Sequence, residues 1–216
     1  MKLYMSRFDN LGAVGPACLK METYGTADEE KHACGLSTLF SKEKECVVVS
    51  IGSQNLWVFE EAIYQNTSCR IEVFDCTVPG ASPPTHIRGR TTLHHICIGD
   101  QDAVINGQTF LSWASITKRI GMTAAPAYVK MDIEGYEYNV LRGIMRDGIL
   151  LPTQIAFELH YETQMGGLAW RDRLLPSSEM VELMQVLYAN GYYLVHRKNN
   201  PYCPHCAELL VARFAV

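Results

Sequence analysis

Strand-like and helix-like segments alternate along this sequence, and few folds can accommodate that order. Seven short runs are rich in β-branched and other apolar residues: Cys46–Ile51, Arg70–Asp75, Leu93–Ile98, Ala127–Asp132, Gln154–Leu159, Tyr192–Arg197 and Glu208–Phe214. Segments with apolar residues at spacings of three and four separate the first six runs, most clearly at Leu56–Gln65, Phe110–Ile120, Tyr136–Asp147 and Ser178–Ala189. Strands that alternate with helices pair in parallel, because each helix returns the chain across a face of the sheet.

The last two strand-like runs are related differently. Only Lys198–Ala207 joins them, which is too short for a crossover helix, so we expect them to pair antiparallel. Runs such as Val47–Val49 and Ile155–Phe157 are apolar on both faces, as expected for central strands covered by helices on both sides. The sequence therefore predicts an α/β fold: one seven-stranded, Rossmann-like, doubly wound sheet, mostly parallel, that ends in an antiparallel hairpin.

Composition is consistent with a single domain and excludes some partners. We expect residues 41–216 to form the domain and residues 1–40 an N-terminal extension with a helix near Glu29–Phe40. The formal net charge of −4 offers no broad basic field to a phosphate backbone, so no nucleic-acid partner is expected. No apolar run is long enough to span a membrane, and Met1–Arg7 lacks the apolar block of a secretion signal. A cytoplasmic location is the default, with the secretory pathway as the alternative if a longer gene product carries an anchor.

Eight cysteines are scattered along the chain. Cys46 and Cys97 lie in apolar runs and are interpreted as small buried core residues. Cys203-Pro204-His205-Cys206 has a metal-ligand spacing, but a zinc site needs further ligands that the sequence does not obviously supply. Structural thiols, a disulfide and a metal site therefore stand as alternatives for the remaining cysteines.

Glycines and polar residues follow five successive strands. They are Gly52, Ser53 and Asn55 after the first, Asp75 after the second, Gly99 and Asp100 after the third, Asp132 and Glu134 after the fourth, and Glu158 and His160 after the fifth. Each of them alone could cap a turn or a helix. Ligands of open α/β sheets bind beyond the carboxyl ends of the strands, so together these residues predict one ligand-binding crevice.

The first of these turns distinguishes between two nucleoside cofactors. An NAD-dependent oxidoreductase needs three glycines in the pattern G-x-G-x-x-G. Here Gly52 is followed by Ser53-Gln54-Asn55-Leu56-Trp57, without the second and third glycines. A cofactor with a ribose but no pyrophosphate fits this turn better, with Asp75 as acceptor for the ribose hydroxyls. S-adenosylmethionine is such a molecule.

The segment Val129-Lys130-Met131-Asp132-Ile133-Glu134-Gly135-Tyr136-Glu137, followed by Val140-Leu141-Arg142-Gly143, resembles the K-x-D-[IV]-E-G-x-E … L-x-G signature of FkbM-type methyltransferases and related class I methyltransferase-like domains. Ser50–Glu60, Val73–Asp75, Phe157–His160 and Cys206–Glu208 occupy the matching places in order, and the resemblance extends from about Gly25 to Phe214. It implies methyl transfer from S-adenosylmethionine, usually to an oxygen.

The resemblance also implies roles for single residues. It places Gly52, Ser53 and Asn55 near the methionine part of the cofactor, Asp75 on the ribose, Gly99 and Asp100 beside the adenine, and Asp132 near the sulfonium and the acceptor. This chain has Ser50 and Asn55 where many members of the wider class carry an acidic residue and a second glycine.

Asp132, Glu158 and His160 are the candidate catalytic residues, because an alcohol becomes a good nucleophile only when a base removes its proton. Their strands are neighbours in this class, and a period of two puts Glu158 and His160 on one side of their strand. We prefer His160 as the base, since an unperturbed histidine has a pKa of about 6.5. The same three residues could instead hold a divalent cation such as Mg²⁺, Mn²⁺ or Ca²⁺.

The sequence thus predicts an S-adenosylmethionine-dependent methyltransferase, with O-methylation of a small or saccharide-like hydroxylated acceptor. The main alternative is a catalytically silent domain that keeps the fold for binding or scaffolding. An NAD-dependent oxidoreductase is the third reading.

Overall fold

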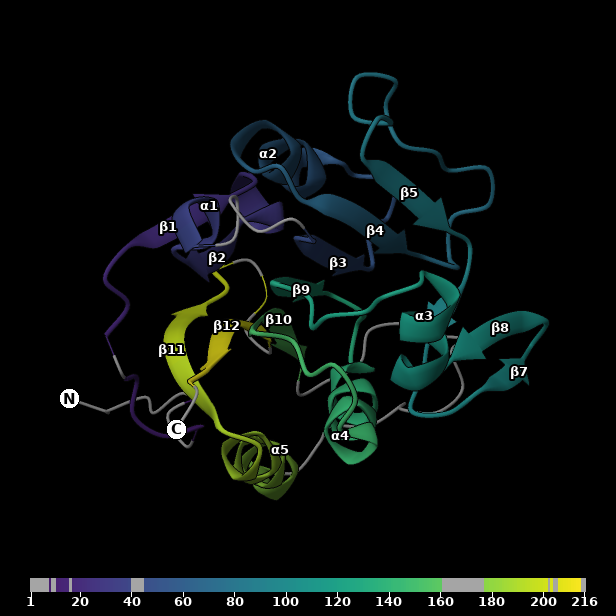
Figure 1. The fold of residues 1–216 in the computed structure, drawn as a ribbon. Coiled ribbons are helices and arrows are strands. Elements are labelled where there is room, and N and C mark those ends of the chain that lie inside the picture. The colour runs from purple at the N-terminus through teal and green to yellow at the C-terminus, as the bar shows by residue number, and fades with distance from the viewer. Residues whose placement is uncertain are drawn as a thin grey trace.

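The computed structural model describes residues 8, 11–15, 17–39, 45–160, 177–201, 203 and 206–214. Its centre is a seven-stranded sheet with the strand order β11-β12-β10-β9-β3-β4-β5 (Figure 1). The strands are β3 (Val47–Ile51), β4 (Arg70–Phe74), β5 (Thr91–His94), β9 (Tyr128–Met131), β10 (Gln154–His160), β11 (Tyr192–Asn199) and β12 (Cys206–Arg213). Strands β10, β9, β3, β4 and β5 are parallel, and β12 runs antiparallel to both β10 and β11. The mostly parallel sheet and the antiparallel pairing of the last two strands are confirmed.

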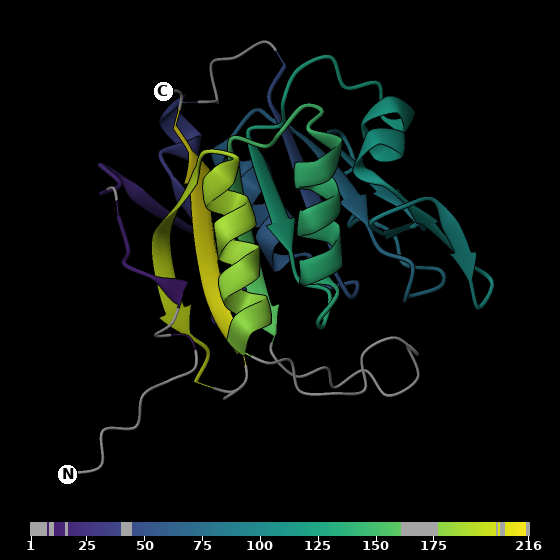
Figure 2. The same ribbon diagram turned by 90° about the horizontal axis from the view of Figure 1, so that it is seen from below.

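Helices cover both faces of this sheet. They are α1 (Leu36–Leu39), α2 (Val58–Asn66), α3 (Trp113–Arg119), α4 (Glu137–Asp147) and α5 (Ser177–Ala189). Figure 1 shows α1 and α2 on one side of the sheet, and Figure 2 shows α4 and α5 side by side over the other. Alternate residues of β3 enter the two resulting cores: Val49 packs with α3, α4 and α5, whereas Val48 packs with α1 and α2.

Among the described residues of the range Glu29–Phe40, where a helix was expected, only those of α1 (Leu36–Leu39) are α-helical. A 3₁₀ turn, η2 (Ala27–Glu29), connects β1 (Met21–Tyr24) to β2 (Lys31–Cys34), and these two strands pair antiparallel. Burial in β2 alternates with a period of two, so this short segment has the pattern of a strand. The Gln154 side chain also binds both backbone groups of Cys34, at 2.7 and 2.8 Å, which holds β2 extended beside β10.

The third predicted strand, Leu93–Ile98, is divided. Its second part, β6 (Cys97–Ile98), joins β7 (Ala103–Ile105) and β8 (Gln108–Leu111) in a separate three-stranded sheet. The helix predicted over Phe110–Ile120 begins only at Trp113, because Phe110 pairs with Cys97 in this small sheet. The Ser112 hydroxyl accepts a hydrogen bond from Ser115 N and caps the helix.

All eight cysteines form disulfides. Cys46 and Cys97 are buried in the core as expected, but both are bonded to other cysteines. The pairs are Cys18–Cys34, Cys46–Cys69, Cys76–Cys97 and Cys203–Cys206. Cys46 and Cys69 directly precede the neighbouring strands β3 and β4, so strand pairing brings them together. In the part of the chain that the structure describes, no helix is long and apolar enough to cross a membrane.

Candidate active site

A cavity opens at the carboxyl ends of β3, β4, β9 and β10. Five of the residues predicted from the sequence line it: Gly52, Asp75, Asp132, Glu134 and Glu158. Gln54 also borders it, together with apolar side chains from the small β6–β8–β7 sheet. The strand ends therefore converge on one crevice, as the positions of the polar residues predicted.

The turn after β3 passes very close to the end of β9. Gly52 has a φ of +77°, and a Cβ added there would lie 1.9 Å from the carbonyl oxygen of Asp132. Gly52 N also donates to Phe74 O at 2.9 Å, so the turn is held against β4. Only glycine can adopt this positive φ and also leave room for the carbonyl oxygen of Asp132. Asn55, by contrast, is outside the cavity lining, and its Oδ1 accepts a hydrogen bond from Trp57 Nε1 at 3.0 Å.

Asp75 is held rigidly by backbone and hydroxyl donors. Its Oδ2 accepts from Ser53 N at 2.9 Å and Gln54 N at 2.7 Å, and its Oδ1 accepts from the amide and hydroxyl of Thr77 at 2.8 and 2.7 Å. Burial by itself would raise the pKa of Asp75, but these donors lower it below its usual value. The carboxylate therefore stays ionised at the cavity wall. Ser53 is buried behind it and does not line the cavity.

Apolar side chains form the wall beyond Asp75. Cys76, Cys97 and Ile98 line the cavity beside Phe110 and Tyr136, whose rings are stacked with centroids 6.2 Å apart. This wall was missed in the sequence because Phe110 was assigned to a helix, although it lies in β8.

Gly99 and Asp100 lie behind this wall and do not line the cavity. Gly99 N donates to Leu111 O at 2.9 Å within the small sheet. Asp100 packs against α4, where a Cβ on Gly143 would come within 2.9 Å of its Cα, and its carbonyl accepts from Arg146. These two residues join the small sheet to α4, so they support the wall from outside.

The signature around β9 stabilises the two turns that frame the cavity. Lys130 donates to the carbonyl oxygen of Gly52. The carboxylate of Glu137, completely buried at the start of α4, accepts from Ile133 N at 3.0 Å and Gly135 N at 2.9 Å. The lysine and the second glutamate of the motif thus have structural roles.

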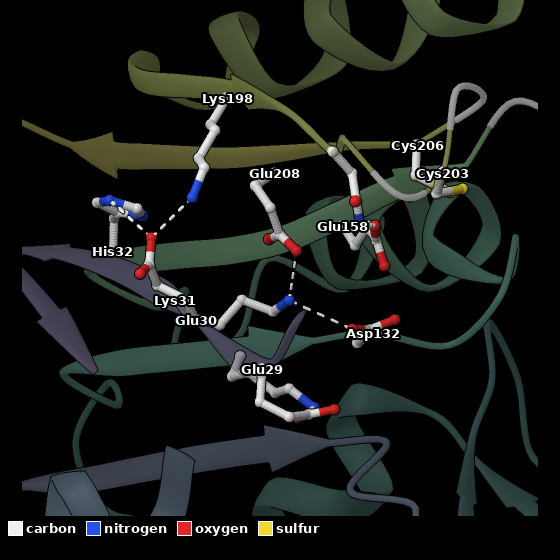
Figure 3. A network of polar contacts seen from close by, with 12 residues as sticks. Glu29, Glu30, Lys31, His32, Asp132, Glu158, Lys198, Cys203, Cys206 and Glu208 are labelled. Atoms are coloured by element: carbon white, nitrogen blue, oxygen red, sulfur yellow. Dashed lines mark hydrogen bonds and ion pairs between the residues drawn. A yellow bond between two sulfur atoms is a disulfide. The ribbon is translucent and has the colours of Figure 1, made fainter. Parts of the chain in front are cut away.

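Asp132 shares a buried ammonium group with Glu208 of β12 (Figure 3). Lys31 Nζ lies 3.2 Å from Asp132 Oδ2 and 2.6 Å from Glu208 Oε1, and its side chain is fully buried. Burial by itself would raise the pKa of Asp132, but Lys31 and Lys130 lower it. Burial raises the pKa of Glu208 to about 7, with Lys31 opposing and Asp132 adding to the rise. Lys31 belongs to no motif recognised in the sequence. It lies within residues 1–40, which were expected to form an N-terminal extension outside the domain.

Glu158 lies beside this pair and reaches the cavity. Its Oε1 accepts a hydrogen bond from Asn200 Nδ2 at 2.7 Å. Burial, together with the charge of Asp132, raises the pKa of Glu158 to about 8, although His160 and Asn200 favour the ionised form. This carboxyl group therefore titrates close to neutral pH.

His160 lies deeper and does not line the cavity. Its Nδ1 is 3.2 Å from Glu137 Oε1, and its Nε2 is 3.5 Å from carboxylate oxygens of both Glu134 and Glu158. Burial by itself would lower the pKa of His160, but Glu137, Glu158 and Asp132 raise it to about 10. The raised pKa favours the imidazolium form of the ring at neutral pH.

Among the residues that the structure describes, two sets could offer ligand atoms to a metal ion: Asp132, Glu158 and His160, and Glu158, Cys203 and Cys206. Within each set the ligand atoms lie within 4.8 Å of one another. Cys203 and Cys206 are bonded to each other and have no thiolate to offer. A cation in the other set would compete with the ammonium of Lys31 for Asp132.

Comparison with known proteins supports this fold. The chain superposes on a protein of Clostridium thermocellum described as an rRNA methylase, with a TM-score of 0.52, 12% identity and coverage of 83% of this chain and 92% of that one. A fibrillarin/Nop5p complex gives a TM-score of 0.50 at 9% identity, with coverage of 80% and 74%. Comparison with curated protein sequences finds no match. A family model described as a methyltransferase domain matches residues 14–212, so the chain belongs to this family of methyltransferase domains.

Proposed function

We propose that this chain is an S-adenosylmethionine-dependent methyltransferase of the FkbM type, which methylates a hydroxyl group of a small or saccharide-like acceptor. The observation that carries the proposal is the single cavity in which the Gly52 turn, the ionised Asp75 and the pair Asp132 and Glu158 meet. The signature in β9 and α4 supports the subtype, and the net charge of −4 opposes a nucleic-acid acceptor.

The cavity provides matching groups for the parts of the cofactor. Asp75 would accept hydrogen bonds from the ribose hydroxyls, because a carboxylate has about four acceptor positions. The apolar wall of Ile98, Phe110 and Tyr136 would hold the adenine, and the Gly52 turn would lie against the methionine part. The bound cofactor supplies an electrophilic methyl group, and the protein aligns an acceptor oxygen with it.

Glu158 is the base in this proposal. It borders the cavity next to Asp132, whereas His160 is buried behind it. The imidazolium of His160 and the amide of Asn200 hold the Glu158 carboxylate in place. His160 is therefore a positioning residue.

Direct binding measurements test the proposal. Calorimetry of the full chain with S-adenosylmethionine and S-adenosylhomocysteine should show binding of both. Transfer of labelled methyl groups to a panel of saccharides and small alcohols should then identify the acceptor. Binding without transfer to any acceptor class would favour the silent domain, and binding of neither nucleoside would exclude the cofactor.

The rate of methyl transfer should rise with pH. The carboxylate of Glu158 is the reactive form, and it predominates only above its pKa of about 8. We expect kcat/KM for the identified acceptor to increase from pH 7 to 9. The variant Asn200→Ala loses the hydrogen-bond donor to Glu158 Oε1, which should raise the pKa of Glu158. The rising part of the pH–rate profile, here called its limb, should then move to higher pH. A limb that keeps its position in the variant would argue against Glu158 as the base.

Metal removal should leave the reaction unchanged. Lys31 already neutralises Asp132, so the site holds a positive charge without a divalent ion. Turnover after dialysis against EDTA should equal that of the untreated protein. A loss restored by Mg²⁺ or Mn²⁺ would instead assign Asp132, Glu158 and His160 as metal ligands.

A further inference from the structure

The disulfide Cys76–Cys97 is part of the cavity wall. Cys76 directly follows Asp75, Cys97 begins β6, and both residues line the cavity. Cys97 is buried against Phe110 and Tyr136, and Cys76 packs on the same group. The bond thus joins the polar part of the proposed cofactor site to its apolar part.

The same disulfide fixes the small sheet to the large one. β6 pairs with β8 and not with β5, so β6 belongs to the small sheet. The Sγ–Sγ bond anchors this sheet next to Asp75, and Gln108 Nε2 of β8 donates to Cys76 O at 3.2 Å. On the side of the cavity next to Asp75, this covalent bond and this hydrogen bond link the small sheet to the end of β4, in addition to the contacts that Gly99 and Asp100 make with α4 on the outside.

A second disulfide provides a matched reference. Cys46–Cys69 joins the amino ends of β3 and β4, at the opposite edge of the sheet, and does not line the cavity. Its sequence separation is 23, against 21 for Cys76–Cys97. The two bonds should therefore constrain the unfolded chain to nearly the same extent.

We propose that Cys76–Cys97 is a binding element of the cofactor site, so that this chain binds its cofactor well only when oxidised and acts in an oxidising compartment. The inference rests on the proposed cofactor. The bond forms when two thiols lose two protons and two electrons to a disulfide-bearing oxidant, whose own disulfide becomes two thiols. The pairing of all eight cysteines is typical of secreted proteins and of the endoplasmic reticulum lumen, and it supports the secretory-pathway alternative.

Two double variants of the full chain separate binding from stability. Cys76→Ser with Cys97→Ser should bind S-adenosylhomocysteine about tenfold or more weakly than the wild type in calorimetry. Cys46→Ser with Cys69→Ser should bind within about twofold of the wild type. Both variants should lose a similar amount of thermal stability. Equal affinities of the two folded variants would overturn the inference, whereas no binding by the oxidised wild type would overturn the cofactor assignment itself.

A measurement on the wild type avoids any folding defect of the variants. The protein is equilibrated in mixtures of reduced and oxidised dithiothreitol, with and without S-adenosylhomocysteine, and the alkylated cysteines are quantified by mass spectrometry. Because coupling between two equilibria is reciprocal, the ligand should protect Cys76–Cys97 from reduction and leave Cys46–Cys69 unaffected. Equal protection of both disulfides, or of neither, would contradict the proposal.

Discussion

Replacement of Lys31 by methionine should destabilise the protein by about 3–5 kcal/mol, the usual effect of removing one partner from a buried ion pair. The variant leaves the carboxylates of Asp132 and Glu208 close together without their shared cation. Methionine keeps the length and much of the volume of the side chain, so the decrease in the free energy of unfolding reflects removal of the positive charge. Urea unfolding at neutral pH measures it.

Lys198→Met is the matched control. Lys198 Nζ lies 3.0 Å from Glu30 Oε1, but its side chain is 48% exposed, and surface pairs contribute only about 0–1 kcal/mol. An equal loss in the two variants would show that the buried cluster has no special importance.

The deficit of the Lys31 variant should shrink as the pH falls. The pKa of Glu208 is already raised to about 7 with Lys31 present, and loss of the cation raises it further. A carboxyl group whose pKa is raised on folding stabilises the folded state at low pH and loses this contribution as the pH rises through that pKa. Unfolding at pH 5 and pH 8 should therefore show the larger deficit at pH 8.

Gly52→Ala should weaken the binding of S-adenosylhomocysteine roughly 10- to 100-fold. The new Cβ would lie 1.9 Å from the Asp132 carbonyl oxygen, so either the turn or the end of β9 must move. Overpacking of this kind costs about 1–3 kcal/mol, and each 1.4 kcal/mol corresponds to about tenfold in affinity. Calorimetry measures the change.

Gly107→Ala controls for the backbone conformation. Gly107 has a φ of +79°, against +77° for Gly52, but a Cβ there meets nothing within 4 Å. The variant Gly107→Ala should lose about 1–2 kcal/mol of stability, because alanine is unfavourable in the left-handed backbone conformation. Its affinity for S-adenosylhomocysteine should be unchanged. Equal behaviour of the two variants would mean that the close approach to Asp132 is unimportant.

The central sheet was predictable because its signals are local. Each parallel strand is a short apolar run, and polar residues follow it where the chain leaves the core, as at Asp75 and Asp132. The same reasoning located the cavity, because parallel strands bring their carboxyl ends to one edge of the sheet.

The remaining parts depend on contacts between distant segments. Lys31 is 101 residues from Asp132 and 177 from Glu208, and no periodicity marks it. The first part of the helix expected over Glu29–Phe40 is instead the strand β2, which docks beside β10, and of the described residues in this range only Leu36–Leu39 are α-helical. The choice between His160 and Glu158 as the proposed base also depends on such contacts: Glu137 is one of the groups that raise the pKa of His160, and only the folded chain shows that contact.

The position of β12 has a consequence for how the molecule is made. β12 lies between β10 and β11 in the sheet but follows both of them in the sequence. During synthesis, β10 and β11 therefore lack the strand that pairs with both until β12 has emerged from the ribosome. Glu208 arrives with that strand, and until then Lys31 lacks one of its two anionic partners. Nascent chains tend to fold unit by unit from the N-terminus, but this one can complete neither its sheet nor its site that way. The complete set of charges around Lys31 therefore forms only after synthesis has passed β12.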